Sequence, residues 1–169
     1  VSGPVHLPPP YGVRLVQDER AAEMRDAIVA ETADADVLVM AAAVADYQTP
    51  EALGQKIKRQ DRDGLELTLV RTPDILSEVG TRPGLVKVAF AAESHDLLEN
   101  ARHKLESKGV DLIAANDITE AGSGFGADTN RVVLLDRDGG QQELPLLSKY
   151  EVACRILDRV AALLGGAAG

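Results

Sequence analysis

The chain has 169 residues, 45% of them hydrophobic, which is enough for one globular domain with a sizeable core. Acidic residues outnumber lysine and arginine 27 to 18, and the net charge of −9 argues against a general nucleic-acid binder, which would show a basic face. No run of residues approaches the roughly 18–20 apolar residues of a membrane-spanning helix. A single cysteine, Cys154, excludes an intrachain disulfide, and we expect a cytoplasmic protein.

The acidic balance still leaves room for an anionic small ligand, because a few lysines at one pocket outweigh the net charge at hydrogen-bonding distance. The histidines offer less. His6, His95 and His103 lack the spacing of a metal site, so we expect no metal held by the protein alone.

The first predicted elements are a helix and a buried strand. A helix over 19–32, with Asp18 as its N-cap, places Ile28 and Val29 among its apolar positions. The continuously apolar run DVLVMAAA, residues 36–43, is typical of a strand that is buried on both faces of a parallel sheet.

The segment KIKRQDRDGLELTLVR, residues 56–71, predicts an antiparallel β-arm that turns at 61–64. Leu65, Leu67 and Leu69 alternate with less apolar neighbours and give the arm one apolar face. Such a face needs a partner, either within the fold or on another subunit.

A second strand and helix follow the arm. Residues 85–91 predict a core strand, and residues 96–108 predict a helix with Ser94 as a candidate cap and Gly109 at its end. Residues 111–115 return as another buried strand.

The end of the chain predicts a hairpin and a last helix. Residues 131–136 and 142–146 are joined through Asp-Gly-Gly at 138–140, a hairpin signal. Ser148 and Glu151 have the spacing of a capping box. The buried stripe of this helix comprises Val152, Ile156, Val160 and Leu163.

Alternating helices and strands predict an α/β fold: a Rossmann-like, doubly wound, mostly parallel sheet with an inserted antiparallel arm and a carboxy-terminal hairpin. We expect one nucleotide-binding domain over 1–164 and a flexible tail over 165–169. The strand and Gly-rich turn that usually open such a fold are not in this sequence, which starts as if inside the domain.

Several chemical signals follow the predicted strands. In AAAVADY, residues 41–47, small residues at a strand end allow a flat ligand to approach the backbone, and Asp46 can accept hydrogen bonds from ribose hydroxyls. Lys56, Lys58 and Arg59 supply three cations in four residues, which suits phosphate. Tight helix–sheet packing and a solvated basic arm explain the same residues about as well.

Other signals are weaker alone. TPDI, residues 72–75, predicts a helix start capped by Thr72, and the ring of Phe90 can pack on a base or in the core. Lys104 and Lys108 share one helix face, which favours a bridging anion or a solvated surface. The glycines after Asn116 do not form a convincing phosphate cradle, because a strand rather than a helix follows them.

AAAVADY, KIKR, TPDIL, VAFAAE, the paired lysines and DLIAAND, in this order and spacing, closely resemble the phosphopantothenoylcysteine synthetase (phosphopantothenate–cysteine ligase) family. That domain is often the second half of the bacterial bifunctional coenzyme A biosynthesis protein, also called the DNA/pantothenate metabolism flavoprotein. VSGPVHLP extends the resemblance to nearly the whole chain.

The resemblance implies ligation that depends on CTP and Mg²⁺. The carboxylate of 4′-phosphopantothenate attacks the α-phosphate of CTP, giving an acyl-cytidylate and pyrophosphate, and the amine of cysteine then displaces CMP. FMN belongs to a fused decarboxylase domain that is absent from this sequence. The family's GGT-like turn and Asn-Ser-Ser-Gly segment are also absent, so we expect the nucleotide-binding part of the site without a full catalytic cycle.

The resemblance also assigns residues. Lys56 would stabilise charge on the reacting phosphate, and Asn116 would lie near the substrate. Because parallel strand ends open on one edge, we expect Lys56, Lys104 and Lys108 to converge on one anion site. The arm 56–71 would form a homodimer, as in similar enzymes. The nucleotide contacts implied are Met40, Ala41, Ala42, Asp46, Lys56, Thr72, Pro73, Asp74, Ile75, Phe90, Lys104 and Lys108.

Two alternatives stay open at this point. A short-chain or extended dehydrogenase shares the small-residue strand end, but it needs Tyr-x-x-x-Lys, and none of Tyr11, Tyr47 and Tyr150 has a lysine four residues later. A non-catalytic dimerising module is the second alternative, given the apolar face of the arm.

Overall fold

The computed structural model describes residues 1–50, 66–124 and 126–166, and its centre is a five-stranded sheet. In spatial order the strands are β1 (Val37–Met40), β4 (Val86–Glu93), β5 (Leu112–Asp117), β7 (Val133–Asp136) and β8 (Gln141–Glu143). β1, β4 and β5 are parallel to one another, whereas β7 and β8 are antiparallel additions. The predicted α/β class and the carboxy-terminal hairpin are confirmed.

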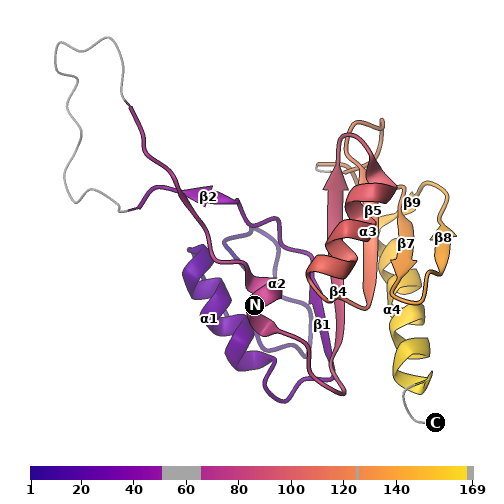
Figure 1. Cartoon of the computed structure of the whole chain (residues 1–169), viewed down its shortest axis with the longest axis horizontal. Helices are drawn as coiled ribbons and strands as arrows, with labels where there is room; N and C mark the ends of the chain where they lie inside the picture. Colours follow the sequence, from indigo (N-terminus) through magenta and orange to yellow (C-terminus); the bar gives the residue numbers. More distant parts are fainter. Residues whose placement is uncertain (51–65, 125, 167–169) are drawn as a thin grey trace.

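Helices cover both faces of this sheet (Figure 1). They are α1 (Ala21–Glu31), α2 (Ile75–Val79), α3 (Leu97–Ser107) and α4 (Lys149–Gly166). Along β4, Ala89 and Ala91 pack in the cluster with α1, α2 and α3, whereas Val86 and Val88 pack in the cluster with α4. Because both faces are covered, β4 and β5 have continuously apolar sequences.

The last helix begins as predicted. The backbone N–H of Ser148 donates to the Glu151 carboxylate at 3.0 Å, and the N–H of Glu151 donates to Ser148 Oγ at 3.2 Å. The capping box is therefore closed in both directions. Val152, Ile156 and Val160 are buried against the sheet, four residues apart on one helix face.

The start of α1 differs from the prediction. Asp18 is not the cap: its side chain is buried, and its N–H donates to the Ser2 carbonyl at 3.1 Å. Instead, Glu23 Oε2 accepts hydrogen bonds from the backbone N–H groups of Glu19 and Arg20. Of the two apolar positions named for this helix, Ile28 is buried and Val29 is exposed.

The start of α3 is also shifted. Asp96, with a φ of 48°, is the N-cap residue, whereas Ser94 Oγ lies 3.1 Å from His95 Nδ1. The end is as predicted, because α3 stops at Ser107 and Gly109 takes a positive φ of 54°.

The first strand is less buried than its apolar sequence suggests. β1 ends at Met40, so residues 41–43 lie beyond the strand and are exposed. In β1 itself Met40 is buried, but Val39 is 42% exposed. The physical reason is that β1 is the edge strand of the described sheet.

The base of the predicted arm is a short antiparallel ribbon formed by β2 (Tyr47–Gln48) and β3 (Val70–Arg71), which leads away from the sheet (Figure 1). The turn of the arm and Leu65 lie outside the described residues. Leu67 and Leu69 are exposed. A second ribbon pairs β6 (Thr129–Asn130) with β9 (Leu147–Ser148).

Candidate functional site

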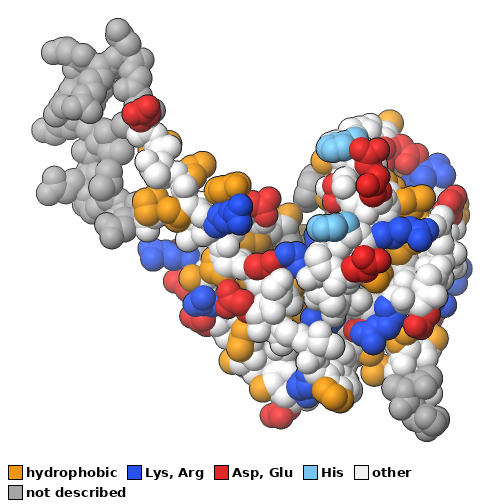
Figure 2. Space-filling view, viewed as in Figure 1, with side chains coloured by type: hydrophobic (Ala, Val, Ile, Leu, Met, Phe, Trp, Pro, Cys, Tyr) orange, Lys and Arg blue, Asp and Glu red, His pale blue; other side chains and the backbone are white. Residues whose placement is uncertain are grey.

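A cavity of about 430 Å³ lies at the end of β1, beside Phe90 of β4. Ligands of open α/β sheets bind at this edge, outside the carboxyl ends of parallel strands. Figure 2 shows a hollow between the part that leads to the arm and the part that carries α3. The lining residues are Met40, Ala42, Val44, Asp46, Tyr47, Arg71, Thr72, Pro73, Asp74, Ile75, Leu76, Phe90, Lys104 and Lys108.

All the predicted nucleotide contacts except Ala41 and Lys56 line this cavity. Ala41 is exposed outside the lining, and Lys56, together with Lys58 and Arg59, lies outside the described residues. Asn116 is buried in β5 opposite Ala92 and is not part of the lining. The expected position of Asn116 near the substrate stays a prediction.

Sequence reasoning missed four lining residues, Val44, Tyr47, Arg71 and Leu76. Each had a local signal. Val44 and Tyr47 belong to AAAVADY, and Arg71 and Leu76 flank the TPDI segment.

Thr72 joins the two loops that form one wall of the cavity. Its hydroxyl donates to the Ala45 carbonyl at 2.6 Å, and its backbone N–H donates to the Asp46 carbonyl at 2.9 Å. The prediction that Thr72 caps a helix is wrong, because this hydroxyl is used across the loops. Asp74 is the N-cap of α2 instead, and its Oδ1 accepts from the Ser77 N–H at 3.3 Å.

Lys104 and Lys108 reach the cavity from one face of α3, as their spacing predicted. Lys104 Nζ donates to the Phe90 carbonyl, within β4, at 2.7 Å. The Lys108 ammonium group forms an ion pair with the Asp74 carboxylate. The two cations therefore contact two different segments, strand β4 and the N-cap of α2.

The surroundings of Lys104 and Asp74 shift the pKa values of both side chains. Burial lowers the pKa of Lys104 below 10.5, and the nearby positive charge of Lys108 adds to this, against the attraction of Glu93. Partial burial favours a higher pKa for Asp74, but hydrogen bonds from Lys108 and Ser77 outweigh burial and hold this pKa below 3.8. At neutral pH Asp74 is thus an anion that neutralises Lys108.

The lining combines two kinds of surface. Met40, Ala42 and Ile75 offer an apolar area beside the half-buried Phe90, which suits a flat ring. The ammonium groups of Lys104 and Lys108 suit an anionic group. The arrangement fits a ligand with an aromatic end and a charged end.

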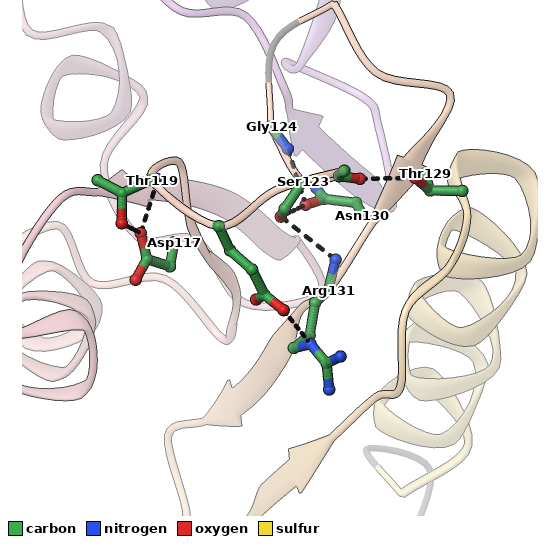
Figure 3. A network of polar contacts seen from close by, with 9 residues as sticks. Asp117, Thr119, Ser123, Gly124, Thr129, Asn130 and Arg131 are labelled. Atoms are coloured by element: carbon green, nitrogen blue, oxygen red, sulfur yellow. Dashed lines mark hydrogen bonds and ion pairs between the residues drawn. The ribbon is translucent and has the colours of Figure 1, made fainter.

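The glycine-containing loop after β5 is a separate polar network, shown in Figure 3. Asn130 Oδ1 accepts hydrogen bonds from Ser123 Oγ at 2.5 Å and from the Gly124 N–H at 3.3 Å. Thr129 Oγ1 donates to the Gly122 carbonyl at 2.6 Å. These groups satisfy one another and do not belong to the cavity lining.

Among the described residues, no cluster of three or more histidine, cysteine or carboxylate side chains is arranged to hold a metal ion. None of the described helices combines the length and the apolar character needed to cross a bilayer.

The mixed α/β fold and the cavity at its parallel strand ends define a doubly wound, ligand-binding type of domain. A model of the family described as the DNA/pantothenate metabolism flavoprotein C-terminal domain matches residues 1–164. The chain belongs to this family.

Individual relatives agree with this result. The chain is 43% identical over 165 residues to the coenzyme A biosynthesis bifunctional protein CoaBC of Bacillus subtilis, covering 96% of the chain and 40% of the relative. For the protein of the same name from Escherichia coli K12, the identity is 39% over 166 residues, covering 95% and 40%. The chain thus spans about 40% of the length of these relatives.

A solved structure of similar fold also matches the chain. The crystal structure of the C-terminal domain of the coenzyme A biosynthesis bifunctional protein CoaBC aligns with a TM-score of 0.79 and 34% identity. The alignment covers 97% of this chain and 72% of that one.

Proposed function

We propose that this chain is the nucleotide-binding part of a phosphopantothenate–cysteine ligase that uses CTP. The single observation that carries the proposal is the cavity that brings Asp46, Phe90, Lys104 and Lys108 to one edge of the sheet. The family membership and the relatives named for coenzyme A biosynthesis support it.

In the proposed reaction the carboxylate of 4′-phosphopantothenate displaces pyrophosphate from CTP to form an acyl-cytidylate. The amine of cysteine then attacks the acyl carbon and releases CMP. A free carboxylate is a poor acyl donor, so the first step supplies a good leaving group. The protein's task in that step is to hold the triphosphate and to offset the charge that develops on it.

Different lining residues would bind different parts of the nucleotide. Asp46 is placed to accept hydrogen bonds from ribose hydroxyls, and the ring of Phe90 to pack on the base. Lys104 and Lys108 would bind phosphate, and Lys108 would exchange its Asp74 partner for the ligand. Lys56 keeps its proposed role at the reacting phosphate, although it lies outside the described residues.

Mg²⁺, when bound, offsets triphosphate charge. It commonly binds through one or two carboxylates together with substrate phosphates. Of the two described lining carboxylates, Asp74 is engaged by Lys108 and Asp46 is assigned to the ribose hydroxyls. The ion would therefore be held chiefly by the triphosphate.

The proposal extends to partners. A homodimer through 56–71 would cover Leu67 and Leu69, whose side chains are 63% and 53% exposed. The greater length of the relatives leaves room for a second, flavin-dependent decarboxylase domain that would carry FMN.

Calorimetric titration of the chain with CTP, ATP and NADPH tests the proposal. We expect CTP to bind more tightly than NADPH, and Asp46→Ala and Phe90→Ala each to weaken CTP. Asp158→Ala is the matched control, because Asp158 is an exposed residue of α4 that is not part of the lining. A preference for NADPH, or unchanged CTP affinity in both site variants, would refute the proposal.

A further inference from the structure

Arg71, at the base of the arm, lines the cavity. In the β2–β3 ribbon it is paired with Tyr47. Directly opposite residues of an antiparallel pair project from the same face of the ribbon. Tyr47 and Arg71 both line the cavity, so this face of the ribbon is turned toward the ligand space.

The charges of the lining make Arg71 distinctive. Asp46 and Asp74 carry two negative charges, and Lys104 and Lys108 carry two positive charges, which leaves Arg71 to make the described lining net positive. Lys108 is already paired with Asp74, and Lys104 already donates to the Phe90 carbonyl. Within the described part of the chain, the Arg71 side chain is exposed and has no hydrogen bond or ion pair.

The backbone around Arg71 is held in place. The next residue, Thr72, donates from its N–H to the Asp46 carbonyl and from its hydroxyl to the Ala45 carbonyl. These bonds tie the Arg71 backbone to the loop that follows β1. An anchored backbone whose guanidinium group has no partner among the described residues favours recognition of a ligand, because little backbone entropy is lost on binding.

We propose that Arg71 binds the phosphate groups of the nucleotide and selects a nucleoside triphosphate over a monophosphate. The proposal rests on the proposed function. A guanidinium group presents a planar fork of donors that engages two phosphate oxygens in a fixed geometry, whereas an ammonium group acts as a point charge.

The test compares the wild-type chain with Arg71→Gln and Arg71→Lys by calorimetric titration with CTP and with CMP. Arg71→Gln should weaken the affinity for CTP by about 10- to 100-fold, the range for losing a hydrogen bond to a charged group. CMP affinity should change by less than about threefold, because CMP lacks the β- and γ-phosphates. Arg71→Lys keeps the positive charge but lacks the planar fork of donors. Its CTP affinity should therefore lie between those of the wild-type chain and Arg71→Gln.

Arg155→Gln is the matched control. It removes the same charge from an exposed site on α4 outside the lining, and should leave both affinities unchanged. Tripolyphosphate should displace CTP from the wild-type chain, and should do so less effectively from Arg71→Gln.

The outcomes separate this proposal from the proposed function. If the wild-type chain binds CTP and Arg71→Gln leaves the ratio of CTP to CMP affinity unchanged, the role of Arg71 is refuted and the ligase proposal stands. An equal loss for both nucleotides also refutes triphosphate selection. If the wild-type chain fails to prefer CTP over NADPH, both proposals are wrong.

Discussion

Replacing Asp74 with asparagine or alanine separates the two bonds that this side chain makes. Oδ1 accepts the hydrogen bond that caps α2, and Oδ2 belongs to the ion pair with Lys108. Asparagine keeps a side-chain oxygen for the cap and removes the ion pair. Alanine removes both.

The magnitudes follow from exposure. The side chains of Lys108 and Asp74 are 30% and 46% exposed, so the ion pair is screened by solvent and should contribute about 0.2–1 kcal/mol to the free energy of unfolding. Loss of an N-cap typically costs about 0.5–2 kcal/mol. Asp74→Asn should therefore be mildly destabilising, and Asp74→Ala should be destabilising by about 1–3 kcal/mol in total.

Urea unfolding followed by circular dichroism measures these differences, with Lys108→Met and the Asp74→Asn/Lys108→Met double variant completing a mutant cycle. The cycle should return a coupling free energy of about 0.2–1 kcal/mol. A coupling free energy of zero would show that the ion pair does not contribute to stability. Equal losses of unfolding free energy in Asp74→Asn and Asp74→Ala would show that the N-cap hydrogen bond does not contribute to stability.

The same variants predict a dependence on pH. The folded-state pKa of Asp74 lies below 3.8, so its charged form stabilises the fold above the unfolded-state pKa. This stabilisation is lost as the pH falls through the folded-state value. The stability difference between the wild-type chain and Asp74→Asn should be full near pH 6–7 and should narrow from about pH 5 downward. A difference that stays constant to pH 2–3 would contradict the assigned pKa shift.

Three further predictions concern other parts of the molecule. Ser148→Ala should lower the free energy of unfolding by about 0.5–2 kcal/mol, measured in urea, because it opens the capping box of α4; an unchanged midpoint would show that the box is not needed. Ile156→Ala should cost about 2–5 kcal/mol by the same assay, since the side chain is 3% exposed, whereas exposed Leu157→Ala should cost much less. Leu67→Asp should shift sedimentation from dimer to monomer, as burial of each arm leucine contributes about 1–2 kcal/mol, and a wild-type chain that is monomeric at high concentration would contradict the dimer.

Part of the site could be predicted because its residues follow strands that are recognisable in the sequence. DVLVMAAA and LVKVAFA are apolar runs, and parallel strands end at one edge, so Met40 and Phe90 were expected close together. Lys104 and Lys108 are four residues apart in one helix, which places them on one face. Arg71 escaped prediction because its position depends on pairing with Tyr47, and the 23 residues 48–70 separate the two in the chain.

The helix caps also include bonds that the sequence predicts and bonds that it does not. Ser148 and Glu151 satisfy each other within one helical turn, so sequence spacing alone was enough to predict their bonds. Thr72, Asp18 and Ser94 are also good capping residue types, yet none caps a helix here. Thr72 bonds to Ala45, and Asp18 to Ser2 through its backbone, so contacts distant in sequence displaced the local option.

The sequence by itself determined the α/β class, the order of the core elements, the hairpin and the buried stripe of α4, because periodicity, turn residues and helix spacing act over a few neighbouring residues. Only the tertiary structure decided that β1 is an edge strand of the described sheet, that Asp74 pairs with Lys108, and that Arg71 reaches the cavity. Each of these joins segments that are far apart in the chain. Such contacts depend on how the strands align and how the loops meet, which no local pattern encodes.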